Sequence, residues 1–269
     1  MNTNISLITH NLVGWSQNLG IPAEAAKDLI SLAAHVYPDM TSENLEIAAK
    51  LIVFLFAFDD SIDRPDVDEK KLQKEEACLQ SGDPDTPLCG AYREICDFFD
   101  RDPDNWWTKR FHLHFSDYLK GCQWERTLRK EEETPSLQSY IQLRMLIGAV
   151  HLCFDIVGFV NNYPPFGIRV HQLENLASQH ICWVNDLLGY EKEVKEGTTC
   201  NLVAVLSEEN NSSSQDSNSL AQKMIDEALD SFNQIREHLD IQDLKYAQDL
   251  ENWMKGSLIW HENAERYKA

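Results

Sequence analysis

The sequence predicts an all-α fold. Glycine is sparse, with 11 among 269 residues. Apolar residues recur at the spacing of one helix face, and the alternation typical of β-strands is absent. The content of 43% hydrophobic and 25% charged residues is that of an ordinary globular protein. Because no internal repeat is found, we expect one helical domain of about ten helices over residues 1–269.

Charge and cysteine usage exclude several kinds of partner. The chain has 44 acidic and 24 basic residues and a net charge of −20, which argues against nucleic acid or an anionic membrane surface. No uncharged apolar run is long enough for a membrane span. No signal peptide is recognised at the start, and the seven cysteines have no CxxC spacing, so a cytoplasmic protein with reduced thiols is expected. An anionic substrate would need bridging cations or clustered Lys and Arg.

Apolar periodicity and end signals set the expected elements. Thr41 is expected to cap the helix that begins at residue 42, and Pro65 to end it. Residues 81–87 and 207–219 are polar and are expected to be loops, the second of them mobile. The expected helices span residues 5–36 (as one or two helices), 42–62, 67–82, 88–101, 105–130, 136–159, 170–195, 219–239 and 243–265.

The long apolar helix over 42–62 leads into three carboxylates, Asp59, Asp60 and Asp63. Residues four apart share a helix face, so Asp59 and Asp63 point the same way, above Leu55 and Phe56. Neighbouring carboxylates repel one another, and a hard cation such as Mg²⁺ relieves that repulsion. A helix end that continues into an acidic surface loop is the alternative that these residues leave open.

A second polar row follows in the C-terminal half. Asn185, Gly189 and Glu193 are spaced four residues apart, so they lie along one face of a helix. An amide oxygen and a carboxylate two turns apart can chelate a hard cation, with a water beside Gly189. Lys192 next to the row could then meet an anion held by that cation. A solvated, charged helix face is the alternative.

Arg144 lies among Leu143, Met145 and Leu146, where a guanidinium needs a partner. A bound anion could be that partner, and an ion pair with a carboxylate of a neighbouring helix is the alternative. Gly148 follows one turn later, and a mid-helix glycine costs about 0.5–1 kcal/mol relative to alanine, which indicates a helix break or a close approach. The pair Arg266 and Tyr267 near the C-terminal end indicates nothing by itself.

Taken in order, these residues resemble the motifs of class I terpene synthases (terpene cyclases) of the microbial single-domain type. Asp59–Asp63 is similar to the family's DDxxD motif, and Asn185–Glu193 to its NDxxSxxxE motif, except that Gly189 replaces the serine or threonine. Arg144 matches the arginine that senses pyrophosphate, and Gly148 falls where the effector glycine at the helix break often lies. The C-terminal Arg-Tyr pair of the family is also present.

The resemblance implies a single-domain helical bundle around a central apolar pocket. It also implies Mg²⁺-dependent ionisation and cyclisation of an isoprenyl diphosphate, most often farnesyl diphosphate, to a sesquiterpene hydrocarbon or alcohol with release of pyrophosphate. Three Mg²⁺ ions are expected. The implied metal-site residues are Asp59, Asp60, Asp63, Asn185, Gly189 (through water) and Glu193. The implied catalytic positions are Asp59, Arg144 and Gly148. The implied substrate-binding residues are Arg144, Lys192, Arg266 and Tyr267 for the pyrophosphate, and Leu55, Phe56, Ile147, Ile181 and Trp260 for the prenyl chain.

Two alternatives stay open, and a third is disfavoured by the sequence. The substrate could be geranyl or geranylgeranyl diphosphate instead. A chain-elongating prenyltransferase should carry a second DDxxD motif, which the chain lacks. A non-catalytic protein that binds prenyl diphosphates is motivated by Gly189. Pairing of two copies along a helical face, to give a homodimer, is also left open.

Overall fold

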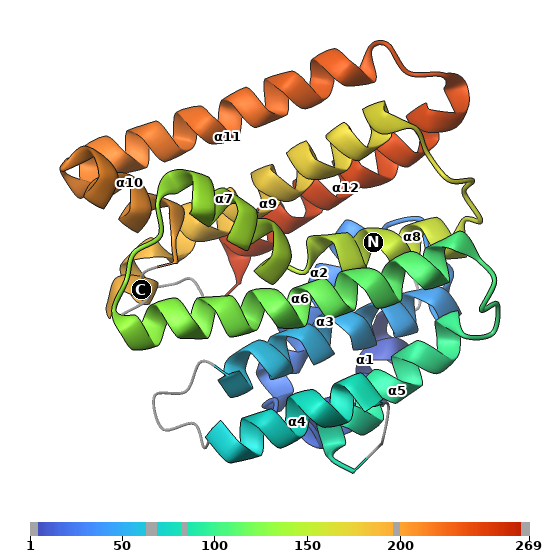
Figure 1. Ribbon diagram of the computed structural model, residues 1–269. Helices are drawn as coiled ribbons and strands as arrows, with labels where there is room; N and C mark the ends of the chain where they lie inside the picture. The colour runs from blue at the N-terminus through green and yellow to red at the C-terminus, as the bar shows by residue number, and fades with distance from the viewer. Residues whose placement is uncertain (1–4, 63–68, 82–84, 196–199, 265–269) are drawn as a thin grey trace. The chain divides into compact units, whose positions relative to one another are not determined.

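The computed structural model describes residues 5–62, 69–81, 85–195 and 200–264. Over these residues the chain forms twelve α-helices and no β-strand (Figure 1), which confirms the all-α class. The chain divides into two compact units, Met1–His112 with Asp155–Asn162, and Leu113–Phe154 with Tyr163–Ala269. The single domain over 1–269 and its central pocket stay predictions.

The first unit is centred on α3 (Ser42–Ile62), whose bounds match the predicted helix. Thr41 Oγ1 accepts a hydrogen bond from Asn44 N at 3.4 Å, as expected for its cap. Helix α3 packs against α1 (Ile5–Gln17), α2 (Ala23–Val36) and α5 (Pro87–Phe99). Because α3 has neighbours on several sides, it is buried around most of its circumference. A helix that is apolar on all sides is expected to be buried in this way.

A buried ion pair lies in the other part of this unit. Arg110 lies near the start of α6 (Trp106–Glu131), and Asp155 lies on α8 (Val150–Val160). Arg110 Nε is 3.0 Å from Asp155 Oδ1, and the two side chains are 8% and 0% exposed. The guanidinium also lies over the rings of Trp106 and Trp107. Burial without such partners would be strongly unfavourable for both charges.

A disulfide joins α4 (Glu69–Ser81) to α5, between Cys78 and Cys89, with the Cα atoms 6.2 Å apart. Thr86 Oγ1 caps α5 by accepting from Cys89 N at 3.2 Å, and α5 packs back against α4. The prediction of reduced thiols is therefore wrong at this pair. It was based on the cysteine count and spacing and on the start of the chain, and none of these shows which cysteines become neighbours in the fold. The other five cysteines are buried thiols.

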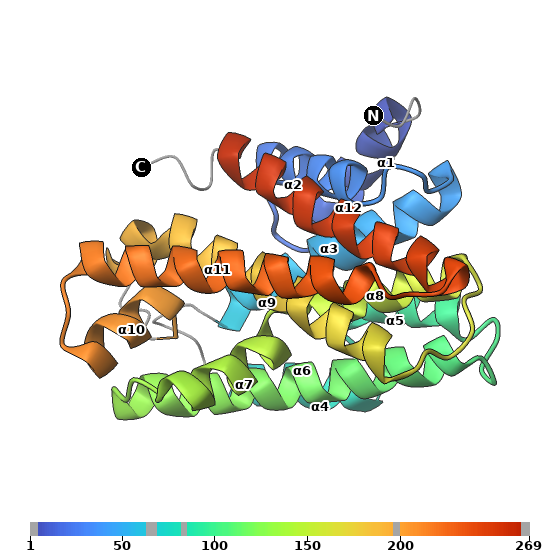
Figure 2. The same cartoon turned by 90° about the horizontal axis from the view of Figure 1, so that it is seen from above.

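The second unit is built on α9 (Ile168–Lys195), which packs against both α11 (Ser214–Arg236) and α12 (Ile241–Asn263). Figures 1 and 2 both show these long helices running side by side. Helices α7 (Leu137–Ile147) and α10 (Leu202–Asn210) complete one end of the unit, where they contact α9 and each other. Tyr140, Leu143, Val203 and Leu206 are among the buried residues that form the core there.

The predicted helix over 136–159 is wrong as one helix, because it is broken into α7 and α8. Gly148 follows α7, Ala149 has a left-handed φ of 54°, and the two helices are bent by 43°. A Cβ at position 148 would lie 2.4 Å from Cys182 Sγ, so only glycine allows this approach of α7 to α9. Both meanings of the Gly148 signal, a break and a close approach, are thus present.

The predicted loop over 207–219 is also wrong for most of its length. Helix α10 continues to Asn210 and α11 begins at Ser214. Asn211 ends α10 with a left-handed φ of 47°. Ser213 caps α11, since its Oγ accepts from Asp216 N at 3.2 Å. The Ser and Asn residues that suggested a loop serve here as helix caps, which they also favour.

No described helix is by itself both long enough and apolar enough to cross a membrane. Helices α7 and α8 reach that length and apolarity only as one bent pair.

Candidate functional site

The acidic end of α3 belongs to the first unit. Asp59 is half-buried and Asp60 is exposed, in the last turn of the helix. Asp63 lies outside the described residues. Below them on the same helix, Leu55 is buried and Phe56 is half-buried. Asp59 and Asp60 thus follow an apolar stretch of α3, and the shared helix face of Asp59 and Asp63 stays a prediction.

The second polar row lies on the C-terminal part of α9 in the second unit. Asn185 and Glu193 are half-buried, Gly189 is buried and Lys192 is exposed. The helix continues to Lys195, so the four-residue spacing places Asn185, Gly189 and Glu193 along one face. Glu193 Oε2 accepts a hydrogen bond from Asn201 Nδ2 at 2.9 Å.

Arg144 reaches from α7 to this row. Its Nε and Nη2 lie 2.9 and 2.7 Å from Asp186 Oδ1. Its Nη2 also donates to Asn185 Oδ1 at 2.8 Å. Charge-assisted bonds of this kind are stronger than neutral ones and define a geometry. The expected ion pair with a neighbouring helix is therefore present, and it holds the guanidinium directly beside the predicted metal ligand Asn185.

Asp186 connects three elements, although the sequence analysis assigned it no role. Its Oδ2 accepts from the hydroxyl of Tyr140 on α7 and, at 2.8 Å, from Leu202 N at the start of α10. Its backbone oxygen accepts from Asn201 Nδ2 at 2.8 Å. Asp186 is only 1% exposed, and these bonds satisfy a carboxylate that burial would otherwise disfavour. The position of Asp186 on the core-facing side of α9 could have indicated a buried carboxylate that needs partners.

Burial and charge shift the pKa values of this cluster. Burial lowers the pKa of Arg144, but the carboxylate of Asp186, together with Cys182, Tyr140 and Glu193, raises it well above its usual range. The guanidinium therefore stays charged. Burial and Asp186 both raise the pKa of Tyr140, which keeps its hydroxyl proton for the bond to Asp186. Burial, followed by the charge of Asp186, raises the pKa of Glu193 to about 7.

The remaining predicted residues are distributed as follows. Ile147 is half-buried at the end of α7, and Ile181 on α9 and Trp260 on α12 are buried. Gly148 lies against Cys182, one turn of α9 before Asp186. The pair at 266–267 lies outside the described residues. Within the second unit, the structure thus brings Arg144 into direct contact with the α9 row.

The donor chemistry of the two acidic segments fits Mg²⁺. Asn185 and Glu193 offer an amide oxygen and a carboxylate, and Asp59 and Asp60 offer carboxylates, which are the ligands that this ion takes. The raised pKa of Glu193 shows a carboxylate whose ionised form a nearby cation would stabilise. Among the described residues, no cluster of three or more His, Cys, Asp or Glu side chains forms a metal site by itself.

His261 on α12 is a further residue of this cluster that was not predicted from the sequence. This buried side chain lies with its Nε2 3.0 Å from Asn185 Nδ2. Its Nδ1 lies 2.7 Å from the backbone oxygen of Ser257, one turn earlier on α12. A histidine near the end of an amphipathic helix carries no sequence signal for such a contact.

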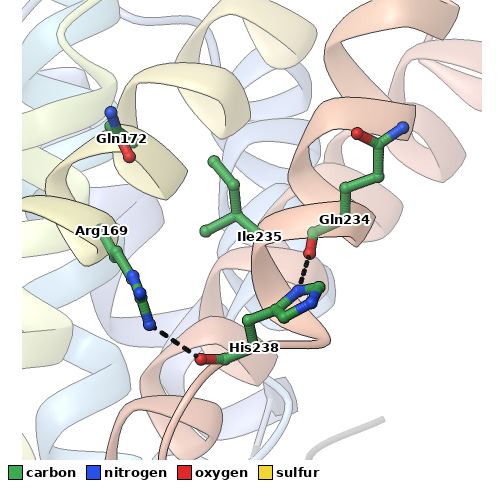
Figure 3. A pocket seen from close by; sticks show the side chains of 5 residues that line it. All are labelled: Arg169, Gln172, Gln234, Ile235 and His238. Carbon is green, nitrogen blue, oxygen red and sulfur yellow. Dashed lines mark hydrogen bonds between the residues drawn. The ribbon is translucent and has the colours of Figure 1, made fainter.

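A surface pocket lies elsewhere in the second unit, between the start of α9 and the end of α11 (Figure 3). Its volume is about 420 Å³. Arg169 Nη1 donates to His238 O at 3.2 Å across it. The lining residues are Arg169, Gln172, Gln234, Ile235 and His238. Because none of the predicted site residues is among them, this pocket is distinct from the α9 row.

Comparison with known proteins identifies the family. The family model for terpene synthase family 2, C-terminal metal binding, matches residues 50–231. The (+)-T-muurolol synthase of Roseiflexus castenholzii, described as (2E,6E)-farnesyl diphosphate cyclizing, is 32% identical over 265 residues, 88% of this chain and 79% of the relative. The chain belongs to the terpene synthase family. Membership makes it an enzyme of the class I terpene synthase type.

Solved terpene synthase structures share the fold. The linalool/nerolidol synthase of Streptomyces clavuligerus superposes with a TM-score of 0.85 at 16% identity, covering 97% of this chain and 96% of that one. The 2-methylisoborneol synthase of Streptomyces coelicolor A3(2), in complex with Mg²⁺ and geranyl-S-thiolodiphosphate, gives 0.81 at 20% identity, covering 98% and 93%. The helical architecture of terpene synthases is thus present in this chain.

Proposed function

We propose that this terpene synthase ionises farnesyl diphosphate and cyclises the C15 chain to a sesquiterpene hydrocarbon or alcohol, releasing pyrophosphate. The C15 substrate is supported by the relative that is named as farnesyl diphosphate cyclizing and is 32% identical to this chain. The single observation that carries the chemistry is the contact of Arg144 with Asn185 and Asp186. It places a fixed positive charge beside an oxygen-rich helix face.

Arg144 has the properties that pyrophosphate release requires. Ionisation breaks the bond between C1 and oxygen, and the electron pair leaves with the pyrophosphate. Donors that are already in place when this negative charge develops stabilise the transition state, because they need little reorganisation. Arg144 is held in position by Asp186 and stays charged. We assign it the first contact with the leaving group, together with Lys192, Arg266 and Tyr267.

The proposal includes three Mg²⁺ ions. Asp59, Asp60 and Asp63 would hold two of them, and Asn185, Glu193 and a water beside Gly189 would hold the third. When bound, Mg²⁺ supplies positive charge that makes pyrophosphate a better leaving group. This role also explains how a chain with a net charge of −20 accepts an anionic substrate.

The allylic cation that remains needs walls without strong nucleophiles. Aliphatic and aromatic side chains exclude water, and aromatic faces attract cations. The cation is quenched by loss of a proton, which gives a hydrocarbon, or by addition of water followed by loss of a proton, which gives an alcohol. We assign the walls to Leu55, Phe56, Ile147, Ile181 and Trp260.

The deciding experiment incubates purified protein with Mg²⁺ and, separately, geranyl, farnesyl and geranylgeranyl diphosphate. Products are analysed by gas chromatography–mass spectrometry, and released pyrophosphate is quantified. We expect a C15 product from farnesyl diphosphate only, and none after chelation of Mg²⁺. The matched variant Asp59→Ala should lose pyrophosphate release.

Each other outcome has a distinct meaning. A product from the C10 or C20 substrate alone would correct the chain length and keep the reaction class. Binding of all three diphosphates without any product would replace the proposal with a non-catalytic binding protein. Unchanged turnover in Asp59→Ala would remove the assignment of the first acidic segment.

A further inference from the structure

His261 makes two hydrogen bonds of different kinds. Its Nδ1 lies 2.7 Å from Ser257 O, a backbone carbonyl that can only accept. The ring proton therefore resides on Nδ1. Its Nε2 lies 3.0 Å from the side-chain amide nitrogen of Asn185. Because an amide nitrogen can only donate, Nε2 is the acceptor, and both contacts are satisfied by one neutral tautomer.

The amide of Asn185 is thereby fixed from both sides. Arg144 Nη2 can only donate hydrogen bonds, and it lies 2.8 Å from Asn185 Oδ1. If the amide were rotated by half a turn, its NH₂ would face the guanidinium and its oxygen would face the Nε2 lone pair. Both contacts would then be repulsive. The hydrogen-bond partners of an asparagine side chain show which of its two end atoms is the oxygen. Here Arg144 and His261 both require the same orientation of the Asn185 amide.

The surroundings of His261 give it little freedom. The side chain is 6% exposed on α12, and its ring lies edge-on against Trp260, with the centroids 5.0 Å apart. Helix α12 packs along α9, which carries Asn185. Its contacts with Ser257 and Trp260 on its own helix therefore hold the imidazole in position beside Asn185.

We propose that His261 is a positioning residue that accepts a hydrogen bond from the Asn185 amide and keeps Asn185 Oδ1 oriented as a ligand for a divalent cation. The inference rests on the proposed function, since it assumes that Asn185 is a metal ligand. Groups that orient a metal ligand typically change metal affinity by about 10- to 100-fold when they are removed. His261 itself touches neither the ion nor the substrate in this account.

The test measures binding of Mn²⁺, as a probe for Mg²⁺, in the presence of inorganic pyrophosphate, with free Mn²⁺ detected by electron paramagnetic resonance. Three variants are compared with the unmodified protein. His261→Phe removes the acceptor and keeps a ring. His261→Gln restores an acceptor oxygen near the position of Nε2. His180→Phe replaces another buried histidine, which lies on α9 itself and is 7% exposed.

We expect His261→Phe to weaken Mn²⁺ binding by about 10- to 100-fold, His261→Gln to recover most of the loss, and His180→Phe to bind like the unmodified protein. Equal losses in the Phe and Gln variants of His261, or an equal loss in His180→Phe, would assign the effect to packing and overturn the proposal. So would unchanged binding in His261→Phe.

A measurement on the unmodified protein keeps the proposal testable if His261→Phe does not fold. Long-range ¹H–¹⁵N spectra distinguish histidine tautomers, and the His261 signals are identified by their loss in His261→Gln. We expect the neutral Nδ1–H tautomer; a proton on Nε2 would overturn the proposal. Failure of the unmodified protein to bind Mn²⁺ with pyrophosphate would instead overturn the proposed function.

Discussion

The guanidinium of Arg144 on α7 is held by the carboxylate of Asp186 on α9, with Nη2 2.7 Å from Oδ1 and with exposed fractions of 15% and 1% for the two side chains. Removal of one partner from a buried pair leaves a desolvated charge. We therefore expect Arg144→Met to lower the free energy of unfolding by about 3–5 kcal/mol. Urea unfolding measures the change. In Arg144→Met/Asp186→Asn the loss should be smaller than the sum of the single losses, and strict additivity would contradict the coupling.

Gly148→Ala tests the close approach of α7 to α9. The new Cβ would lie 2.4 Å from Cys182 Sγ and 2.9 Å from Arg144 O, so we expect a loss of about 1–3 kcal/mol from overpacking. Cys182→Ala in the same chain should restore part of the stability. The control is Gly14→Ala on α1, where nothing lies within 4 Å of the added Cβ. There the melting temperature should stay constant or rise, and a fall like that of Gly148→Ala would contradict the prediction.

Asp155→Asn tests the buried ion pair of the first unit. Asp155 is fully buried against Arg110, so neutralising it should cost about 3–5 kcal/mol. The matched control is Asp97→Asn, which breaks the exposed pair with Arg93, where the side chains are 53% and 60% exposed. Such pairs contribute about 0–1 kcal/mol. Chemical denaturation of both variants compares the two values, and equal losses would show that burial of the pair has no effect.

His180 should make stability depend on pH. Burial lowers its pKa below the ordinary histidine value of about 6.5, and the charge of Asp226 only partly opposes this shift. As the pH falls below about 6.5, the unfolded chain takes up a proton that the folded chain does not. Stability is therefore retained above that pH and falls below it, by at most about 1.4 kcal/mol per pH unit. Urea midpoints across this range should show the slope, and His180→Phe should reduce it.

Gly189→Ser tests the departure from the family motif. By the motif resemblance, Gly189 stands where the family has serine or threonine, and it lies between Asn185 and Glu193 on one helix face. An added hydroxyl gives the proposed ion another oxygen ligand, so the Mg²⁺ concentration for half-maximal activity should fall several-fold. Gly189→Ala adds a Cβ without the oxygen and should not lower it. An equal fall in both variants would point to helix stabilisation instead.

The sequence was sufficient where local signals agree. Helix α3 has a cap at Thr41, a continuous apolar run and a proline shortly after its end, and its bounds were predicted from these features. Arg144 was recognised because a charge within an apolar segment needs a partner. The α9 row was recognised because residues four apart share a helix face. Each of these signals depends only on neighbours along the chain.

The remaining features depend on contacts between distant segments. The disulfide of Cys78 with Cys89, the bond of Tyr140 to Asp186 and the contact of His261 with Asn185 each join different helices. The loop predicted over 207–219 failed for another reason. Ser and Asn favour both loops and helix caps, and composition alone does not decide between the two.

The bonds of Asp186 to Tyr140, Arg144 and Leu202 also bear on protein engineering. These three partners come from two helices, α7 and α10, and they satisfy one buried carboxylate on a third helix, α9. In chimeras with related enzymes, a crossover between positions 140 and 202 would combine partners that were selected in different parents. Residues 140–202 should therefore be exchanged as one block, whereas libraries that aim to change the product can vary the proposed wall residues outside this block independently.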